Sequence, residues 1–158
     1  MAAAEKTNVM RVLDQKKIPY TPHSYPADGP LDGESVARTL GADPMRVFKT
    51  LVTVGASKKY YVFCIPGPRT LDLKAAAKTV GEKSIAMLRQ AELLPLTGYV
   101  HGGCSPVGMK KLFPTVIDES AGEWERIFVS AGKIGFQVEL APGDLAPLVR
   151  AKFAHVTE

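Results

Sequence analysis

Four glycines gather in one short stretch of the sequence, where a backbone without side chains can approach a ligand closely. They are Gly98, Gly102, Gly103 and Gly108, and they lie in the segment Thr97–Lys111, which ends in two lysines. Backbone amides in such a loop can form an anion-binding nest, and a long loop without secondary structure is uncommon unless it has a function. The segment therefore predicts an anion-binding loop. The alternative is a surface connection with a basic end.

A second glycine-containing turn, Ser130–Gly135, lies between two expected strands. Its sequence approaches the phosphate-binding pattern G-x-x-x-x-G-K-[ST]. However, Ile127 stands at the position of the first glycine and Ile134 follows the lysine. These two departures exclude a nucleoside-triphosphate loop of that type. The turn is either a plain hairpin connection or a turn that faces a ligand.

Lys49 interrupts an otherwise apolar run from Val47 to Val52. A lysine within a strand usually points to solvent, but the residues around Lys49 do not alternate cleanly between apolar and polar. On a half-buried strand, a lysine can instead present a point charge to a phosphate or a carboxylate. From this residue alone both interpretations stay open.

The residue types needed for metal or covalent catalysis are sparse and scattered. His101 and Cys104 have an i,i+3 spacing, but a zinc site needs three or four ligands. Cys64 falls inside an apolar strand, where a thiol behaves as a small hydrophobic group, and Ser105 lacks the G-x-S-x-G nucleophile elbow. We therefore expect no metal ion and no cofactor. Any catalysis would depend on positioning and on backbone electrostatics.

Helices and strands are expected to alternate around these residues. Apolar residues at helical spacing predict helices over residues 5–17, 34–40, 73–80, 89–94 and 142–156. Extended or β-branched runs predict an edge strand ending at residue 25 and strands over 46–54, 60–65, 115–118, 126–130 and 135–140. A turn-rich surface loop is expected over 26–33. The pattern predicts one α/β domain over residues 1–158, with a mixed or largely antiparallel sheet.

Composition excludes several classes of protein. The chain has 158 residues, of which 46% are hydrophobic and 23% charged, and these values are typical of globular proteins rather than disordered or fibrous ones. The charged N-terminal residues do not resemble a secretory signal, and no apolar run approaches the ~20 residues of a membrane span. With only two cysteines, a reduced, cytoplasmic protein is expected. The formal charge of +4 permits a polyanionic partner without requiring one.

Motifs along almost the whole chain, in a fixed order, resemble the YbaK/EbsC family. The motifs are Phe48-Lys49-Thr50-Leu51, Leu71-Asp72-Leu73-Lys74, Thr97-Gly98-Tyr99, Gly103-x-Ser105-Pro106-x-Gly108-x-Lys110-Lys111, Pro114-Thr115-x-Ile117-Asp118, the Ser130–Gly135 turn and Glu139-Leu140-x-x-Gly143-Asp144-Leu145. Each motif alone is weak, but the ordered set is specific.

The resemblance implies a single α/β domain built round a mixed, barrel-like β-sheet flanked by helices. It also implies a trans-editing factor, related to the editing domain of bacterial prolyl-tRNA synthetases, that removes cysteine from mischarged proline tRNA. The attacking group would be the thiol of the substrate itself, so no protein nucleophile, metal or cofactor is implied. The partners would be the mischarged tRNA and prolyl-tRNA synthetase, with no membrane involved.

The resemblance also assigns the site residues. Lys49 would be the essential catalytic residue, holding the phosphate of the terminal adenosine. Tyr25 and Thr50 would shape the aminoacyl pocket. The backbone and hydroxyl contacts would come from a further set of residues, namely Gly103, Ser105, Ser130 and Gly132.

One position departs from the family pattern. Relatives often carry an acidic residue two positions before the glutamate of the Glu-Leu pair, and Gln137 stands there in this sequence. If the acid contacts the amino group of the substrate, Gln137 weakens that contact and alters the amino-acid preference. The same scaffold acting on alanyl-tRNA or another misacylated tRNA is therefore an alternative. A third is a non-catalytic module that binds tRNA or prolyl-tRNA synthetase.

Overall fold

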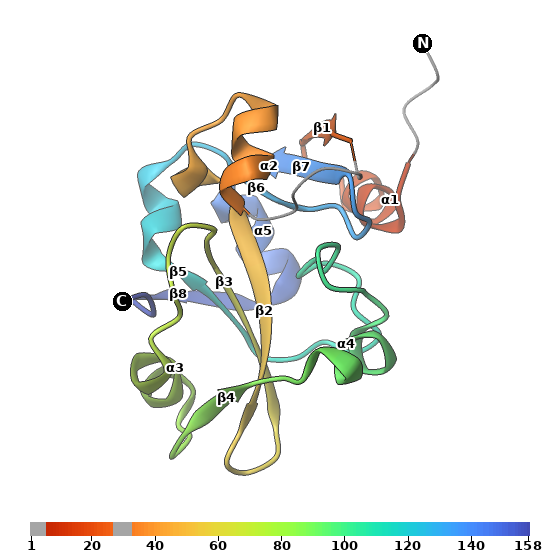
Figure 1. Ribbon diagram of the computed structural model, residues 1–158. Helices are drawn as coiled ribbons and strands as arrows, with labels where there is room; N and C mark the ends of the chain where they lie inside the picture. The colour runs from red at the N-terminus through yellow and green to blue at the C-terminus, as the bar shows by residue number, and fades with distance from the viewer. Residues whose placement is uncertain (1–5, 27–32) are drawn as a thin grey trace.

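The structure is a computed structural model that describes residues 6–26 and 33–158 (Figure 1). The loop predicted over 26–33 therefore lies almost wholly outside the described residues. The helices are α1 (Asn8–Gln15), α2 (Gly33–Leu40), α3 (Leu73–Val80), α4 (Gln90–Thr97) and α5 (Pro142–Val149), with short 3-10 turns η1 (Pro44–Arg46) and η2 (Glu119–Glu123). The strands are β1 (Thr21–Ser24), β2 (Phe48–Gly55), β3 (Tyr60–Pro66), β4 (Ile85–Met87), β5 (Thr115–Asp118), β6 (Ile127–Ser130), β7 (Phe136–Leu140) and β8 (Ala151–Ala154). No helix in the described ranges has the length and apolar composition needed to cross a bilayer.

The larger sheet has five strands in the order β4-β2-β3-β5-β8. At its centre β2 and β3, which lie where strands were predicted over 46–54 and 60–65, form an antiparallel hairpin in which Lys49 lies opposite Ile65. Both strands are rich in β-branched and aromatic residues, which favour a pleated, half-buried surface. β4 pairs with β2 only at residues 53–55. β5 runs parallel to β3, and β8 runs parallel to β5. The expected mixed sheet is therefore confirmed.

The smaller sheet has three antiparallel strands in the order β1-β7-β6. Gln137 lies in its middle strand, with His23 opposite it on one side and Ser130 on the other. An isolated parallel bridge between Val47 and Phe128 links the two sheets. The helices that flank the sheets were predicted and are present, but the described strands form two open sheets rather than a barrel.

The five-stranded sheet separates two apolar cores. On one face the side chains of Phe48 and Val52 join the larger core, together with α1, α5 and the smaller sheet. On the other face Leu51 packs with Phe63 and with Ala76 of α3. Because side chains alternate between the faces of a strand, the side chain of Lys49 leaves β2 on the α3 face.

The helix predicted over 142–156 is wrong beyond Val149. The next residue, Arg150, has a φ of 54° and caps the helix in the left-handed conformation. The chain then continues as β8, where Phe153 lies opposite Ile117 of β5. The apolar residues of 145–153 fit helical spacing, but hydrogen bonding to the parallel edge of β5 outweighs that local preference.

Candidate active site

A cavity of about 280 Å³ lies where the two sheets meet. It occupies the gap along one edge of β2, between the Val47–Phe128 bridge and β4. The cavity brings together five of the residues predicted to form the site, which come from separate strands and from the segment after β1. They are Tyr25, Lys49, Thr50, Ser130 and Gln137.

Lys49 supplies the positive charge of this cavity. Its Nζ donates a hydrogen bond to the backbone carbonyl of Gly67 at 3.0 Å. Among the described residues no carboxylate forms an ion pair with Lys49. Burial lowers the pKa of its ammonium group below the ordinary value. A partly buried ammonium held by a neutral carbonyl is an incomplete ion pair, and it favours an anionic ligand in the cavity.

Gln137 supplies an unused hydrogen-bond acceptor. The residue is 6% exposed, lines the cavity, and its Oε1 atom has no hydrogen-bond partner among the described residues. Leaving a buried carbonyl without a donor costs about 1–3 kcal/mol. The arrangement therefore fits a ligand that brings an N–H or O–H group to this atom, such as an amino group.

The edge of β2 adds backbone groups to the site. Leu88 N donates to the Val52 carbonyl at 3.1 Å, so the backbone polar groups of Val52 point toward β4. Because these groups alternate between the two edges of a strand, the N–H and C=O of Thr50 point the same way, into the gap where β4 does not reach. The Thr50 hydroxyl lies 3.9 Å from the Cys64 sulfur.

Tyr25 and Ser130 close the side of the cavity formed by the smaller sheet. The Tyr25 amide donates to the Gly135 carbonyl at 2.9 Å, which fixes its backbone against the turn after β6. The Ser130 hydroxyl accepts a hydrogen bond from the Gly132 amide at 3.1 Å. A serine hydroxyl can accept a second hydrogen bond and donate one, so Ser130 keeps the capacity to bind a ligand.

Three of the predicted contact residues do not line the cavity. Gly103 faces the turn after β6, because a Cβ there would lie 3.1 Å from the Ile134 nitrogen. Ser105 is fully buried, and its hydroxyl accepts a hydrogen bond from the Val107 amide. Gly132 has a φ of +88° and packs against Tyr99. In the structure these residues hold the glycine loop against the neighbouring turn.

The cavity is also lined by residues to which the sequence assigned no individual contact, three of them from the segment Thr97–Lys111 predicted to bind an anion. Gly67 provides the carbonyl that fixes Lys49, and Leu93 of α4 adds an apolar wall. His101, Gly102 and Cys104 line the cavity from the glycine loop. Except for Leu93, these residues lie in turns and loops, whose position depends on tertiary packing and for which periodicity gives no signal.

The two cysteines are protonated thiols. Burial raises the pKa of Cys104 to about 12 and that of Cys64 to about 12. At neutral pH only about one thiol in 10⁵ is then ionised, and the thiolate is the nucleophilic form. No described group of three or more His, Cys, Asp and Glu residues gathers closely enough to hold a metal ion.

A charged cluster supports the strand that carries Gln137. Glu139 accepts hydrogen bonds from His23 at 2.9 Å and from Arg46 at 2.8 Å. The guanidinium of Arg46 lies over Phe128, 5.0 Å from its ring centroid. Burial alone would raise the pKa of Glu139, but the hydrogen bonds from His23 and Arg46 outweigh burial and lower it. The cluster ties β1, η1 and β7 together beside the cavity.

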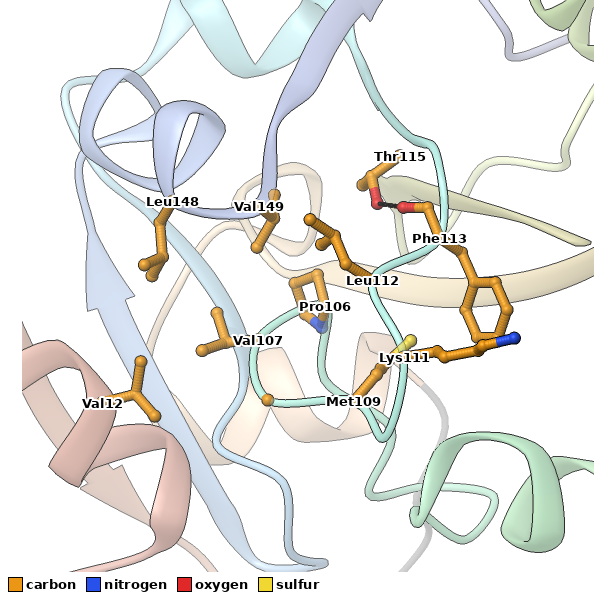
Figure 2. Close-up of a pocket in the computed structure, with 11 residues that line it drawn as sticks. Val12, Pro106, Val107, Met109, Lys111, Leu112, Phe113, Thr115, Leu148 and Val149 are labelled. Carbon is orange, nitrogen blue, oxygen red and sulfur yellow. Dashed lines mark hydrogen bonds between the residues drawn. The ribbon is translucent and has the colours of Figure 1, made fainter.

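A smaller cavity of about 120 Å³ lies between α1, α5 and the second half of the glycine segment with the residues that follow it. Figure 2 shows that Val12, Leu148 and Leu112 surround it, and that the Thr115 hydroxyl donates its hydrogen bond to the Phe113 carbonyl. Its lining is almost entirely apolar. It offers no arrangement of polar groups comparable to that around Lys49.

Comparison with known proteins identifies the family. The sequence matches the aminoacyl-tRNA editing domain over residues 32–148. The chain belongs to the aminoacyl-tRNA editing domain family. It is 47% identical over 154 residues to EbsC of Enterococcus faecalis (strain ATCC 700802 / V583), described as a candidate Cys-tRNA(Pro)/Cys-tRNA(Cys) deacylase. That alignment covers 97% of this chain and 94% of EbsC.

Two further comparisons find similarity between this chain and proteins whose names refer to prolyl-tRNA synthetase. The proline–tRNA ligase of Shouchella clausii (strain KSM-K16) is 30% identical over 111 residues, which are 70% of this chain and 19% of the ligase. A crystal structure of a candidate trans-editing enzyme for prolyl-tRNA synthetase matches with a TM-score of 0.84 and 25% identity. The match covers 98% of this chain and 99% of that one. The family resemblance inferred from the sequence motifs is confirmed.

Proposed function

We propose that this editing-domain protein removes cysteine from mischarged proline tRNA and acts in trans to prolyl-tRNA synthetase. The substrate would enter the cavity with its 3′-terminal adenosine and the esterified amino acid. The observation that carries the proposal is Lys49, a partly buried ammonium group in the cavity that is bound only to the Gly67 carbonyl among the described residues. A phosphate of the terminal nucleotide would complete this ion pair.

Gln137 would receive the amino end of the substrate. The α-ammonium of an aminoacyl ester is a hydrogen-bond donor, and the Oε1 atom of Gln137 is a buried acceptor without a partner. With a cation on one wall and an acceptor on another, the cavity can bind both the anionic and the cationic end of one ligand. That arrangement would fix the ester between them, and orientation of this kind is worth several kcal/mol of the barrier.

The bond-breaking step would use the thiol of the substrate. The cysteine sulfur forms a bond to its own ester carbonyl carbon, the carbon–oxygen bond to the ribose breaks, and the thiol proton passes to the departing ribose oxygen. The products are tRNA with a free 3′ hydroxyl and a cyclic thioester of cysteine, which water then opens. Backbone amides at the β2 edge would stabilise the negative charge that develops on the carbonyl oxygen. The raised pKa of the Cys104 thiol argues against a protein thiolate in this role.

The comparisons support prolyl-tRNA synthetase as the partner enzyme. Part of a proline–tRNA ligase is 30% identical to this chain, and a structural relative is described as a trans-editing enzyme for the synthetase. A free domain that reads only the 3′ end of tRNA has little means of selecting proline tRNA by itself. A synthetase that has just released the mischarged tRNA would supply that selection.

The test is single-turnover deacylation of Cys-tRNA(Pro) and Ala-tRNA(Pro) by the wild type and by Lys49→Met. Methionine keeps the apolar stem that packs on β2 but removes the charge. We expect the variant to keep its thermal stability and to lose about 10²-fold or more of kcat/KM, in line with the loss of a contact that positions the terminal nucleotide. Lys152→Met is the matched control, because Lys152 also lies on a strand and donates to a backbone carbonyl, that of Thr79.

Each outcome of this experiment decides between the alternatives. Release of cysteine from Cys-tRNA(Pro) by the wild type, strongly reduced in Lys49→Met, supports the proposal. Turnover of Ala-tRNA(Pro) alone overturns the substrate assignment and keeps the deacylase. Absence of turnover on both substrates, with and without prolyl-tRNA synthetase, overturns the deacylase and leaves a module that binds tRNA.

A further inference from the structure

A third cavity, of about 500 Å³, lies between α3 and β4 and has a basic lining. Lys74 and Lys78 project from α3, and Lys83 and Ser84 follow in the turn that leads to β4. All four residues are exposed. We call this set the α3 ledge. Figure 1 shows α3 and β4 at the end of the molecule that carries the β2–β3 hairpin, away from α1 and the smaller sheet.

The one acidic residue of this cavity does not neutralise the ledge. Glu82 accepts hydrogen bonds from the Ser57 amide, the Ser57 hydroxyl and the Tyr61 hydroxyl. These bonds, those from Ser57 first, lower the pKa of Glu82 and hold its carboxylate against the hairpin. No ion pair among the described residues joins Lys74, Lys78 or Lys83 to an acid. The lysines therefore present unpaired positive charge to solvent.

The position of Lys74 is unfavourable for the helix itself. Lys74 stands in the first turn of α3, where a positive charge opposes the helix dipole. Lys78 follows at i+4, where it repels Lys74, whereas its own place in the last turn favours the dipole. Ala75, Ala76 and Ala77 already give α3 a high helix propensity, so the lysines are not needed for folding. A charge that opposes the helix dipole, as that of Lys74 does, is typical of a binding surface.

The ledge is connected to the active site by strand β2. Lys49 leaves β2 on the face that α3 covers, as Leu51 does. At the other end of β2, Gly55 pairs with Ile85, which lies beside the ledge and lines its cavity. Gly55 lies six positions along the strand from Lys49, and at about 3.4 Å per residue these six steps span about 20 Å.

This distance matches a nucleic acid strand that ends at Lys49. A stacked RNA strand rises about 3 Å per nucleotide, slightly less than the DNA value, so about six or seven nucleotides cover the same 20 Å. A tRNA whose terminal adenosine lies beside Lys49 would therefore reach the ledge with the paired part of its acceptor stem. Lysines on an exposed helix suit phosphates, because contacts to the backbone position a nucleic acid without reading its sequence.

We propose that the α3 ledge binds the sugar–phosphate backbone of the tRNA acceptor stem while the 3′ end occupies the cavity around Lys49. This inference rests on the proposed function for the identity of the RNA. It assigns to Lys74, Lys78 and Lys83 a role that needs no contact with the reacting ester. The ledge would contribute affinity for the whole tRNA and would not contribute to the chemical step.

The first test measures the binding of uncharged proline tRNA by fluorescence anisotropy at a series of salt concentrations. Lys74→Gln/Lys78→Gln is compared with Arg11→Gln/Lys16→Gln, which removes the same charge from exposed positions at α1. Each phosphate contact contributes about 0.7–0.9 to the slope of log K against log salt, so the ledge variant should lose about 1.5. At about 0.1 M salt its dissociation constant should rise about tenfold or more. The control should keep both values.

The second test uses a substrate too short to reach the ledge. Cysteinyl-adenosine extends only from the cavity around Lys49, so Lys74→Gln/Lys78→Gln should deacylate it at the wild-type rate. The same variant should show a raised KM and an unchanged kcat for Cys-tRNA(Pro). Circular dichroism of both double variants establishes that the helices are intact.

The two proposals fail in different ways. If no ester is hydrolysed but tRNA binding still weakens in the ledge variant alone, the deacylase fails and the ledge stands. If Cys-tRNA(Pro) is hydrolysed and the ledge variant matches the wild type in salt slope and KM, the ledge fails. A general charge effect would also overturn the ledge. It would appear if Arg11→Gln/Lys16→Gln weakened tRNA binding as much as the ledge variant does, or if polyglutamate of the same charge competed with labelled tRNA as well as unlabelled tRNA does.

Discussion

Lys49 and Gln137 line the same cavity although they belong to different sheets. Lys49 stands near the start of β2, and Gln137 stands in the middle strand of the smaller sheet. One brings an ammonium group bound to a carbonyl, and the other brings a carbonyl bound to no donor among the described residues. Their juxtaposition creates a site for a ligand that carries both an anionic group and a hydrogen-bond donor.

Replacing Gln137 with leucine should make the protein more stable but weaken its binding of the substrate. The substitution removes a buried acceptor that lacks a partner, so the free energy of unfolding should rise by up to about 1 kcal/mol. The same change should raise the KM for the aminoacyl-tRNA, because the amino group of the substrate loses its acceptor. Thermal unfolding and steady-state kinetics measure the two effects. A fall in stability, or an unchanged KM, would contradict the role given to Oε1.

Cys104 should react slowly with alkylating reagents. Burial raises the pKa of its thiol from 9.0 to about 12, so the thiolate fraction at neutral pH is about 10³-fold lower than for an ordinary cysteine. The rate of alkylation by iodoacetamide should therefore rise about tenfold per pH unit to beyond pH 9. Cys104→Ala reports the contribution of Cys64. A rate that levels off near neutral pH would show a reactive thiolate and reopen covalent catalysis.

Glu139→Gln should change the way stability depends on pH. Hydrogen bonds from His23 and Arg46 outweigh burial and lower the folded-state pKa of Glu139 below 4.5. Its stabilising effect is therefore fully present above pH 4.5 and is lost as pH falls through the folded-state pKa. At neutral pH the variant should be less stable by about 1–3 kcal/mol, because one partner of a partly buried charge cluster is removed.

The difference between Glu139→Gln and the wild type should shrink as the solution is acidified. Urea unfolding at a series of pH values measures it. Glu119→Gln provides the comparison, since Glu119 is 63% exposed and lies 3.8 Å from His155. Exposed ion pairs contribute about 0–1 kcal/mol. A constant difference across the acidic range would show that Glu139 acts through packing rather than through charge.

Gly132→Ala should destabilise the protein more than Gly81→Ala does. Both glycines have positive φ values, of +88° and +76°, so both substitutions should cost about 1 kcal/mol of backbone strain. A Cβ at Gly132 would also lie 2.9 Å from Tyr99 Cε1 and 3.0 Å from Val9 Cγ2, whereas one at Gly81 has open space. The additional cost should be about 1–3 kcal/mol. Equal unfolding midpoints for the two variants would contradict the close packing of the turn.

The central hairpin could be predicted because its residues carry the signal locally. The β-branched and aromatic residues of 46–54 and 60–65 favour strands in any context, and β2 and β3 lie there. β8 could not be predicted, because Leu145, Leu148 and Phe153 continue a helical period and no glycine marks the helix end. Arg150 adopts the left-handed conformation that ends α5, and this conformation is uncommon for residues other than glycine.

Only part of the candidate site could be predicted from the sequence, because some of its residues carry a signal of their own and others depend on tertiary packing. Lys49 and Gln137 stand out in the sequence, one by charge within an apolar strand and one by departure from a family pattern. The glycine loop was expected to contact the ligand through Gly103. In the structure Gly103 does not line the cavity around Lys49, and it allows the loop to approach Ile134. A glycine that makes room for a ligand and one that makes room for another loop have the same sequence signal, and only tertiary packing distinguishes them.

Because the Val47–Phe128 bridge joins the two sheets beside the cavity, the separation of the cavity walls depends on the angle between the sheets. Among the described strands this bridge is the backbone pairing between the sheets, and it stands two residues from Lys49. A small rotation about this pivot changes the separation of Lys49 and Gln137 while leaving the ladders within each sheet intact. We therefore expect substitutions packed around Phe128 to change the width of the cavity while the strand pairing within each sheet stays intact.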